Sequence, residues 1–191
     1  MYKAIIFDFF GVLCSNVYSN WHVEHPIPTD KEEMQKEYMR SADTGEITES
    51  ELFKEISKLD AETPQKVRDE WLGLSAINTE LVAFVTELKG VYKIALCSNA
   101  PSPFLRDILK KNNLEHLFDE IVISSDVHLA KPDPAIFAFV LRQLGVQSGE
   151  AIFTDDSPQN IAGARSVGIK SFLFSDTKKL RADFKAHDIA G

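Results

Sequence analysis

Four short polar groups in the sequence each stand at or just after an apolar run. They are Asp8 after Ala-Ile-Ile-Phe, Ser98-Asn99 after Ile-Ala-Leu-Cys, Lys131-Pro132 in the loop after Glu-Ile-Val-Ile, and Asp155-Asp156 after Ala-Ile-Phe-Thr. If the runs are parallel strands, all four groups lie at the carboxyl ends of the strands, where open α/β sheets bind ligands. We therefore expect three carboxylates, one lysine and one hydroxyl to face a single crevice.

This set of side chains is suited to chemistry on a phosphate ester. Crowded carboxylates repel each other and need a cation, and an all-oxygen site suits Mg²⁺, which also bridges to phosphate. Lys131 can balance the charge of the phosphate and of a nucleophile. Ser98 with the amides that follow it can hydrogen-bond the equatorial oxygens of a transferring phosphoryl group. Once that charge is neutralised, the carboxylate of Asp8 can attack phosphorus and form an aspartyl-phosphate.

The apolar runs themselves are expected to be the strands of a parallel sheet. They cover residues 4–7, 93–97, 120–123, 151–154 and 170–174. Each is almost continuously apolar, which is typical of strands covered by helices on both faces. Amphipathic segments of helical length alternate with the runs, and this alternation indicates βαβ units. The helices expected among the later strands cover residues 102–113, 133–145 and 158–167.

Start and stop signals predict several helix ends. The expected N-caps are Ser102 and Asp133, each before a proline, and the glycines expected to follow helix ends are Gly145 and Gly168. Two pairs have the spacing of a capping box, Thr29 with Glu32 and Thr48 with Glu51.

Residues 15–80 interrupt the alternation, because they are polar, acidic and patterned as helices with no convincing strand. Helices are expected from Thr29 to Arg40, over residues 48–59 and over 64–74, and another over 80–89 leads back to the sheet. The predicted fold is an α/β, Rossmann-like, three-layer core with a small helical cap inserted after the first strand. The core comprises residues 1–14 and 81–191, and the cap comprises residues 15–80.

The composition is that of an ordinary globular protein, with 44% hydrophobic and 26% charged residues among 191. The net charge of −8 shows no excess of Lys and Arg that would attract the phosphates of a nucleic acid, so no nucleic-acid partner is expected. No stretch approaches the roughly 20 apolar residues of a membrane helix, and Asp8 interrupts the apolar N-terminus. We expect a cytoplasmic monomer or homodimer with no membrane partner. Cys14 and Cys97 form no C-x-x-C pair and are expected to be buried.

In their order and spacing the four polar groups resemble the four motifs of the haloacid dehalogenase-like hydrolases. The motifs are matched by Asp8-Phe-Phe-Gly-Val, Ser98-Asn99, Lys131-Pro132 and Asp155-Asp156-Ser-Pro-Gln-Asn160. The resemblance covers nearly the whole chain and includes a helical cap after the first motif. Within the family the chain is most similar to small sugar-phosphate phosphatases of the glucose-1-phosphatase type. That similarity lies in the cap phrase Thr44-Gly-Glu-Ile-Thr-Glu-Ser-Glu-Leu-Phe53 and in the acidic pair.

The resemblance implies a role for each matched residue. Asp8 would be the nucleophile and a ligand of Mg²⁺, together with the backbone carbonyl of Phe10, with Asp156, and with Asp155 directly or through water. Lys131 and Ser98 would hold the phosphate, with Asn99 and Asn160 positioning neighbouring groups. The residues implied to contact the substrate, a small phosphate ester with a sugar phosphate favoured, are Phe10, Gly11, Ser98, Asn99 and Lys131.

One residue departs from the family pattern. Most phosphatases of the family carry a second aspartate two residues after the nucleophile as general acid and base, and this chain has Phe10 there. The acid is therefore unassigned, and His22, Glu24 and His25 are candidates only if their segment folds over the site.

Three other functions share part of this residue pattern. A dehalogenase of the founding type needs no metal and usually has serine and asparagine in place of Asp155-Asp156, so the acid pair argues against it. A receiver-like phospho-switch has no helical insertion and places its acid pair after the first strand. A non-catalytic phosphate-binding relative is suggested only by Phe10.

Overall fold

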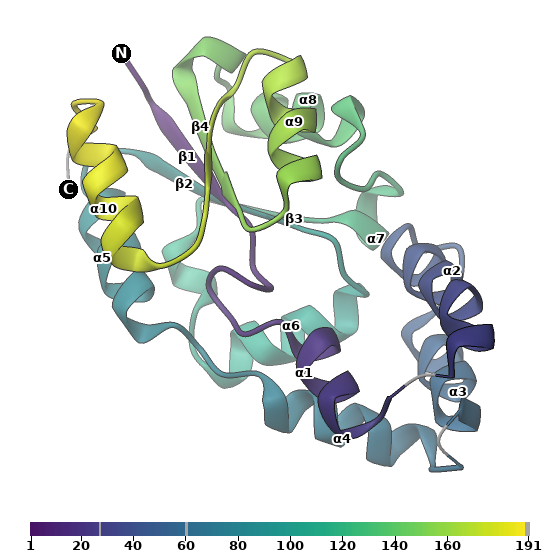
Figure 1. Cartoon of the computed structure of the whole chain (residues 1–191). Coiled ribbons are helices and arrows are strands. Elements are labelled where there is room, and N and C mark those ends of the chain that lie inside the picture. The colour runs from purple at the N-terminus through teal and green to yellow at the C-terminus, as the bar shows by residue number, and fades with distance from the viewer. Residues whose placement is uncertain (27, 60, 190–191) are drawn as a thin grey trace.

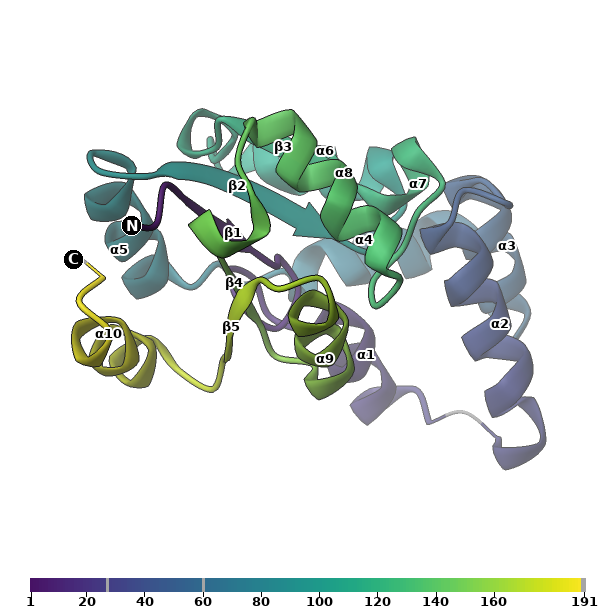
Figure 2. The same ribbon diagram turned by 90° about the horizontal axis from the view of Figure 1, so that it is seen from above.

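A five-stranded parallel sheet forms the centre of the computed structural model, which describes residues 1–26, 28–59 and 61–189. The strand order is β3-β2-β1-β4-β5 (Figures 1 and 2). The strands are β1 (Ala4–Phe7), β2 (Lys93–Ser98), β3 (Glu120–Ile123), β4 (Ala151–Asp155) and β5 (Lys170–Leu173). All five predicted strands are therefore confirmed, with ends that differ by at most one residue. The α/β Rossmann-like core is confirmed with them.

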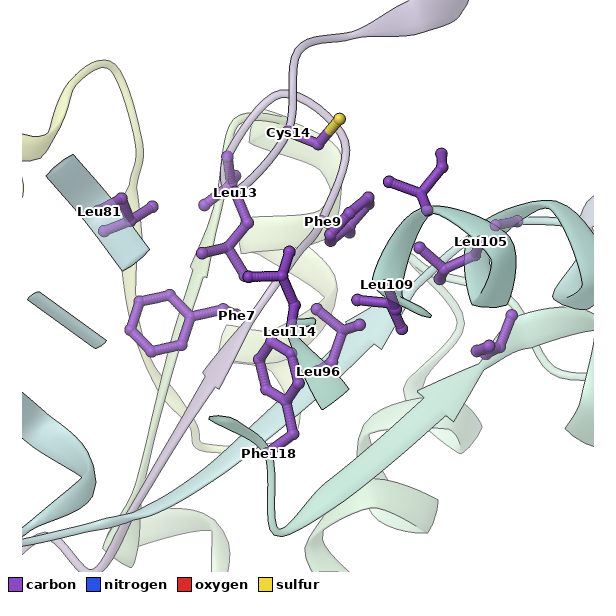
Figure 3. Packing of buried hydrophobic residues seen from close by; sticks show 14 of the residues in the cluster. Phe7, Phe9, Leu13, Cys14, Leu81, Leu96, Leu105, Leu109, Leu114 and Phe118 are labelled. Atoms are coloured by element: carbon purple, nitrogen blue, oxygen red, sulfur yellow. The ribbon is translucent and has the colours of Figure 1, made fainter. Parts of the chain in front are cut away.

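Alternate residues of each strand point into two separate hydrophobic clusters. Ile5 and Phe7 of β1 belong to one cluster, whereas Ala4 and Ile6 belong to the other. The first cluster is covered by α5 (Thr79–Lys89), α6 (Ser102–Lys111) and α10 (Thr177–Ala186). The second is covered by α8 (Pro134–Leu144) and α9 (Pro158–Ser166), on the opposite face of the sheet (Figure 1). Figure 3 shows the first cluster, in which Phe7 and Phe9 pack near Leu96 and Leu109.

Four helices between β1 and α5 lie beyond the carboxyl ends of the strands (Figure 2). They are α1 (Val17–Glu24), α2 (Glu32–Asp43), α3 (Glu49–Leu59) and α4 (Pro64–Leu74). We call these helices the cap. Its aromatic side chains pack on the core helix α6, with the Phe104 ring 5.8 Å from that of Phe53 and 6.0 Å from that of Trp71. Cap and core therefore share one hydrophobic cluster, and the division at residues 14/15 and 80/81 stays a prediction.

The two connections between cap and core run side by side. The amide of Ser15 donates to the carbonyl of Ala76 at 2.8 Å, and the amide of Asn78 donates to the carbonyl of Leu13 at 2.9 Å. The chain thus enters and leaves the cap at adjacent points, next to the carboxyl end of β1.

Local signals account for most helix ends. Thr48 and Glu51 form the predicted capping box, and Asp133 caps α8 as predicted. Two predicted caps are wrong. Thr29 begins a 3₁₀ turn (Thr29–Lys31) before α2, whose N-cap is Lys31, and Ser102 is the first residue of α6, after Pro101. Shorter elements are α7 (Ser124–Val127) and 3₁₀ turns at Glu115–Leu117 and Ser148–Glu150.

Among the described helices of eight or more residues, the sequence analysis did not predict α1 and α10. Each has an N-cap that the sequence contains, Asn16 for α1 and Asp176 for α10, and each cap accepts a backbone N–H. Both cysteines are buried and free, as expected. Within the described residues, no helix combines the length and the apolar character needed to cross a membrane.

Candidate active site

A buried lysine joins two carboxylates at the carboxyl edge of the sheet. The Nζ atom of Lys131 lies 2.7 Å from Oδ1 of Asp8 and 2.6 Å from Oδ2 of Asp155. Burial alone would lower the pKa of Lys131, but the two carboxylates more than offset it and hold the pKa above its usual range. The ammonium therefore stays charged between a strand-end aspartate from β1 and one from β4.

The carboxyl group of Asp8 holds its proton more firmly than an exposed aspartate does. Burial raises the pKa of its carboxyl, Lys131 lowers it, and Asp155 raises it again, for a net rise above the usual range. Its Oδ1 also accepts a 2.6 Å hydrogen bond from the amide of Phe9. Without a cation the site therefore holds more negative charge than Lys131 balances.

Three carboxylates converge closely enough to share a metal ion. Oxygen atoms of Asp8, Asp155 and Asp156 all lie within 4.8 Å of one another. Burial and the nearby Asp155 raise the pKa of Asp156. An all-carboxylate set with one partly exposed member fits magnesium, which binds oxygen and keeps several waters. These three carboxylates are therefore suitable ligands for the predicted Mg²⁺ ion.

Gly11 makes this convergence possible. Its φ is +83°, which favours glycine, and a Cβ at this position would lie 2.1 Å from Oδ2 of Asp156. The loop after β1 can therefore pass beside the carboxylate of Asp156 only without a side chain. Direct contact of Gly11 with substrate stays a prediction.

Asp155 is more firmly held than Asp156. It is fully buried, and besides the contact with Lys131 it accepts 3.0 Å hydrogen bonds from Nδ2 of Asn160 and a 2.8 Å bond from the amide of Ser157. Asn160 therefore positions Asp155 from the first turn of α9. The more accessible Asp156 has the freer oxygens, and the ligand roles of both stay predictions.

The loop that carries Lys131 is held by Asn99. Nδ2 of Asn99 donates to the carbonyl of Lys131, and Oδ1 accepts from its amide, both at 2.8 Å. The peptide bond to Pro132 is cis. Because the amide group of Asn99 is used on this loop, it positions Lys131, and its predicted contact with substrate is untested.

Ser98 and Phe10 complete the predicted set. Ser98 ends β2 fully buried, and its hydroxyl has no hydrogen-bond partner among the described residues. A buried hydroxyl without a partner is free to bind an anion. The Phe10 ring stacks on Phe104 at 6.2 Å, on a core helix rather than on the cap. Ligation of a metal by the Phe10 carbonyl stays a prediction.

A cavity of about 410 Å³ lies between cap and core beside this site. Its apolar and aromatic lining comprises Phe10, Val17, Tyr18, Met39, Trp71 and Phe104. Its polar lining comprises Asn16, Lys36, Arg40, Asp43, Asn99 and Lys131. Lys131 lines the cavity and also contacts the carboxylates of Asp8 and Asp155. Asp43, at the end of α2, is a cavity residue that the sequence analysis missed.

The three acid candidates of the sequence analysis lie elsewhere. Nδ1 of His22 is 3.0 Å from the carbonyl oxygen of His25, and its Nε2 is 3.1 Å from Nε2 of Gln35. His25 stacks on Trp21 at 4.3 Å and lines a separate small pocket together with Glu24. None of the three is among the described residues that line the large cavity.

The Rossmann-like sheet, the helices beyond its carboxyl edge and the carboxylate–lysine site at that edge can be compared with known protein families. Residues 2–168 match the family model for haloacid dehalogenase-like hydrolases. The chain belongs to this family.

Relatives in the family carry several names. The chain is 28% identical to drimenol cyclase drtB of Aspergillus calidoustus over 91% of its length, but this spans only 34% of that protein. It is also 28% identical to sesquiterpene phosphatase astK of Aspergillus oryzae, over 52% of each chain. Among solved structures, a HAD family enzyme of Bacteroides thetaiotaomicron superimposes with a TM-score of 0.77 at 22% identity. The match covers 94% of this chain and 99% of that one, which was crystallised as a mutant with magnesium and inorganic phosphate.

Proposed function

We propose that the protein is a magnesium-dependent phosphatase that hydrolyses a small phosphate monoester through an aspartyl-phosphate on Asp8. The observation that carries this proposal is the joint placement of Asp8, Lys131 and two further acids at the end of β1 and β4. Related proteins named as phosphatases and a structural neighbour crystallised with magnesium and phosphate support it.

Each residue has a defined part in the reaction. The carboxylate of Asp8 attacks phosphorus, while Lys131 balances charge on the phosphate and keeps its contact with Asp155. The partnerless hydroxyl of Ser98 is available to hydrogen-bond a phosphate oxygen. Magnesium bound to Asp8, Asp155 and Asp156 would supply charge neutralisation at the phosphate.

A metal-dependent assay of two proteins tests the proposal. The wild-type protein should hydrolyse p-nitrophenyl phosphate with magnesium and stop when EDTA is added. Asp8→Asn should retain the fold by circular dichroism and lose turnover, because an amide is neither a nucleophile nor an anionic ligand. Turnover by Asp8→Asn above a few per cent of wild type would contradict the nucleophile assignment. EDTA-insensitive release of halide from 2-chloropropionate would favour the dehalogenase alternative.

The first candidate substrate is a sugar phosphate, as the motif resemblance implies. A second candidate is the phosphate ester of a hydrophobic alcohol. It is favoured by the aromatic side chains of Phe10, Trp71 and Phe104 in the cavity wall, since apolar and aromatic lining binds apolar ligand surface. A relative named as a sesquiterpene phosphatase supports the same candidate. Comparing kcat/KM for glucose 1-phosphate, an aryl phosphate and an isoprenyl monophosphate distinguishes the two.

A further inference from the structure

One carboxyl group in the large cavity has no partner. Asp43 lines the cavity together with Lys131, and no described residue makes a hydrogen bond or an ion pair with its side chain. Its side chain is only partly exposed, and it belongs to the cavity wall. An acid in this position is open to a ligand in the cavity.

The end of α2 that carries Asp43 is fixed against the core. Nδ1 of His128, just after α7, lies 2.9 Å from the carbonyl oxygen of Thr44. Gly45 follows with a φ of +72°, and a Cβ there would lie 2.6 Å from the carbonyl oxygen of Ser125. The backbone of the cap therefore touches the backbone of the core at this point. This contact holds Asp43 at the site although it belongs to the cap.

The other titratable groups that line the cavity are already engaged or are too weakly acidic. Lys36 pairs with Glu33, and Arg40 pairs with Glu37 and Glu46. Tyr18 on α1 has a pKa that burial raises further above its usual value. Lys131 is held by its two carboxylates, and no charged residue of α3 is among the described residues lining the cavity. Among the described titratable residues that line the cavity, Asp43 therefore remains as the carboxyl group without a hydrogen-bond or ion-pair partner.

The direction of attack places the leaving group on the cavity side. In phosphoryl transfer the attacking and leaving oxygens lie roughly in line, so the leaving oxygen points away from Asp8. Lys131 contacts Asp8 and also lines the cavity, so a phosphate on Lys131 directs its ester oxygen toward the space that Asp43 faces. Burial raises the pKa of the Asp43 carboxyl to about 7, an increase that Lys131 opposes. Both the acid and its conjugate base are therefore populated at neutral pH.

We propose that Asp43 is the general acid and general base of the reaction, a catalytic role that rests on the proposed phosphatase function. In the first step Asp8 bonds to phosphorus, the ester P–O bond breaks, and the Asp43 proton moves to the leaving oxygen to give an alcohol. In the second step the Asp43 carboxylate takes a proton from water as the water oxygen bonds to phosphorus. The bond from phosphorus to Asp8 then breaks, releasing inorganic phosphate and restoring both acids.

Asp43→Asn tests this role with two substrates in the presence of magnesium. The rate with an alkyl phosphate such as glycerol phosphate should fall by about 10²–10⁴-fold, the usual contribution of general acid–base catalysis. With p-nitrophenyl phosphate, whose leaving group needs no proton, a burst of one nitrophenolate per enzyme should precede slow turnover. Phosphorylated Asp8 should then accumulate and be trapped by acid quench. We expect wild-type turnover of the alkyl phosphate to fall at high pH, as the proton of Asp43 is lost, and this fall should be absent from Asp43→Asn.

The matched control is Asp69→Asn, which changes an exposed acid of α4 that does not line the cavity. It should behave as the wild type, and Asp43→Glu should recover part of the alkyl phosphate rate. Asp43→Asn with wild-type rates, no burst and an unchanged pH profile would overturn the role of Asp43 while Asp8-dependent turnover persists. If the wild type shows no Asp8-dependent turnover of either ester, the proposed function fails first, and the role of Asp43 fails with it.

Discussion

Lys131 contacts two aspartates whose surroundings differ. Asp155 is fully buried and has three further hydrogen bonds, from Asn160 and the amide of Ser157. At Asp8 both contacts, with Lys131 and with the amide of Phe9, are made by Oδ1, so Oδ2 is less engaged. The same lysine can therefore have a structural role toward Asp155 and a chemical role toward Asp8.

This difference predicts opposite effects for the two neighbouring acids of the fourth motif. Asp155→Ala leaves Lys131 with Asp8 as its one carboxylate partner and leaves the donors of Asn160 and Ser157 without their acceptor, so it should destabilise the metal-free protein by about 1–3 kcal/mol. Asp156→Ala should leave that stability unchanged or raise it, because it removes repulsion with Asp155. Asp156→Ala should also weaken magnesium binding more than Asp155→Ala does in the fraction that is folded. Urea unfolding in EDTA and calorimetric titration with magnesium measure the two quantities.

A second prediction concerns Phe10, where the family usually has an acid. If Asp43 supplies the proton, Phe10→Asp should add little to the wild-type rate. In an Asp43→Asn background it should restore alkyl phosphate turnover by up to about 10²–10⁴-fold. Phe10→Leu in the same background controls for the lost stacking on Phe104, and kcat/KM for glycerol phosphate is the measurement. A large gain in the wild-type background would mean that the native protein lacks an effective acid.

The elements that hold the site meet at close backbone contacts. Gly163 in α9 lies against the loop that carries Lys131, since a Cβ there would be 2.3 Å from the carbonyl oxygen of Pro132. Through this close approach to the Lys131 loop, α9 helps to set the position of the lysine.

Gly163→Ala should therefore destabilise the protein, although alanine is the better helix former by about 1 kcal/mol. We expect a net loss of about 1–3 kcal/mol, because backbone atoms must shift to admit the methyl group. Gly73→Ala is the matched control in α4, where no atom lies within 4 Å of a Cβ, and it should stabilise by about 0.4–1 kcal/mol. Thermal unfolding of both variants gives the comparison, and a gain in stability for Gly163→Ala would show that the loop yields freely.

The sheet could be predicted from the sequence because each strand is buried on both faces, so apolar character alone marks it. The helices α1 and α10 were missed although both contain a capping signal. In α10, Leu180 and Phe184 have helical spacing, but the segment contains few other apolar residues, so its helical pattern is weak. Asp43 gave no signal at all, because it is one acid in a polar, acidic helix. Its position depends on the docking of Thr44 and Gly45 on α7, which is a tertiary contact.

At the scale of the whole molecule, the acids of the site predict how stability depends on pH. Asp8, Asp43 and Asp156 all have pKa values above their unfolded values. Between about pH 4 and pH 7 these three acids therefore bind more protons in the folded protein than in the unfolded chain, and their contribution to stability falls as pH rises through this window. Below this pH window the three acids make their full contribution to the free energy of unfolding. Above the window that contribution has been lost and no longer changes with pH.

The metal-free protein should thus have a lower melting temperature at pH 7.5 than at pH 5. Replacing the carboxyl of Asp43 in Asp43→Asn should recover about 1–3 kcal/mol at pH 7.5 and almost nothing at pH 4, allowing for its partial exposure. Magnesium should raise the melting temperature more at pH 7.5 than at pH 5, since protons compete for the same oxygens. Scanning calorimetry with EDTA or magnesium at several pH values measures both effects, and a melting temperature that rises with pH in EDTA would contradict them.

The adjacent connections at Ser15–Ala76 and Leu13–Asn78 also bear on how this enzyme can acquire new substrates. A segment whose two ends lie side by side can be lengthened or replaced by recombination without displacing the strand ends. The sheet edge would keep the proposed reaction while the cap side of the cavity, proposed to contact the alcohol, is exchanged as one unit. The exchange has one requirement here: an incoming segment must supply an apolar surface for Phe104, where Phe53 and Trp71 now pack.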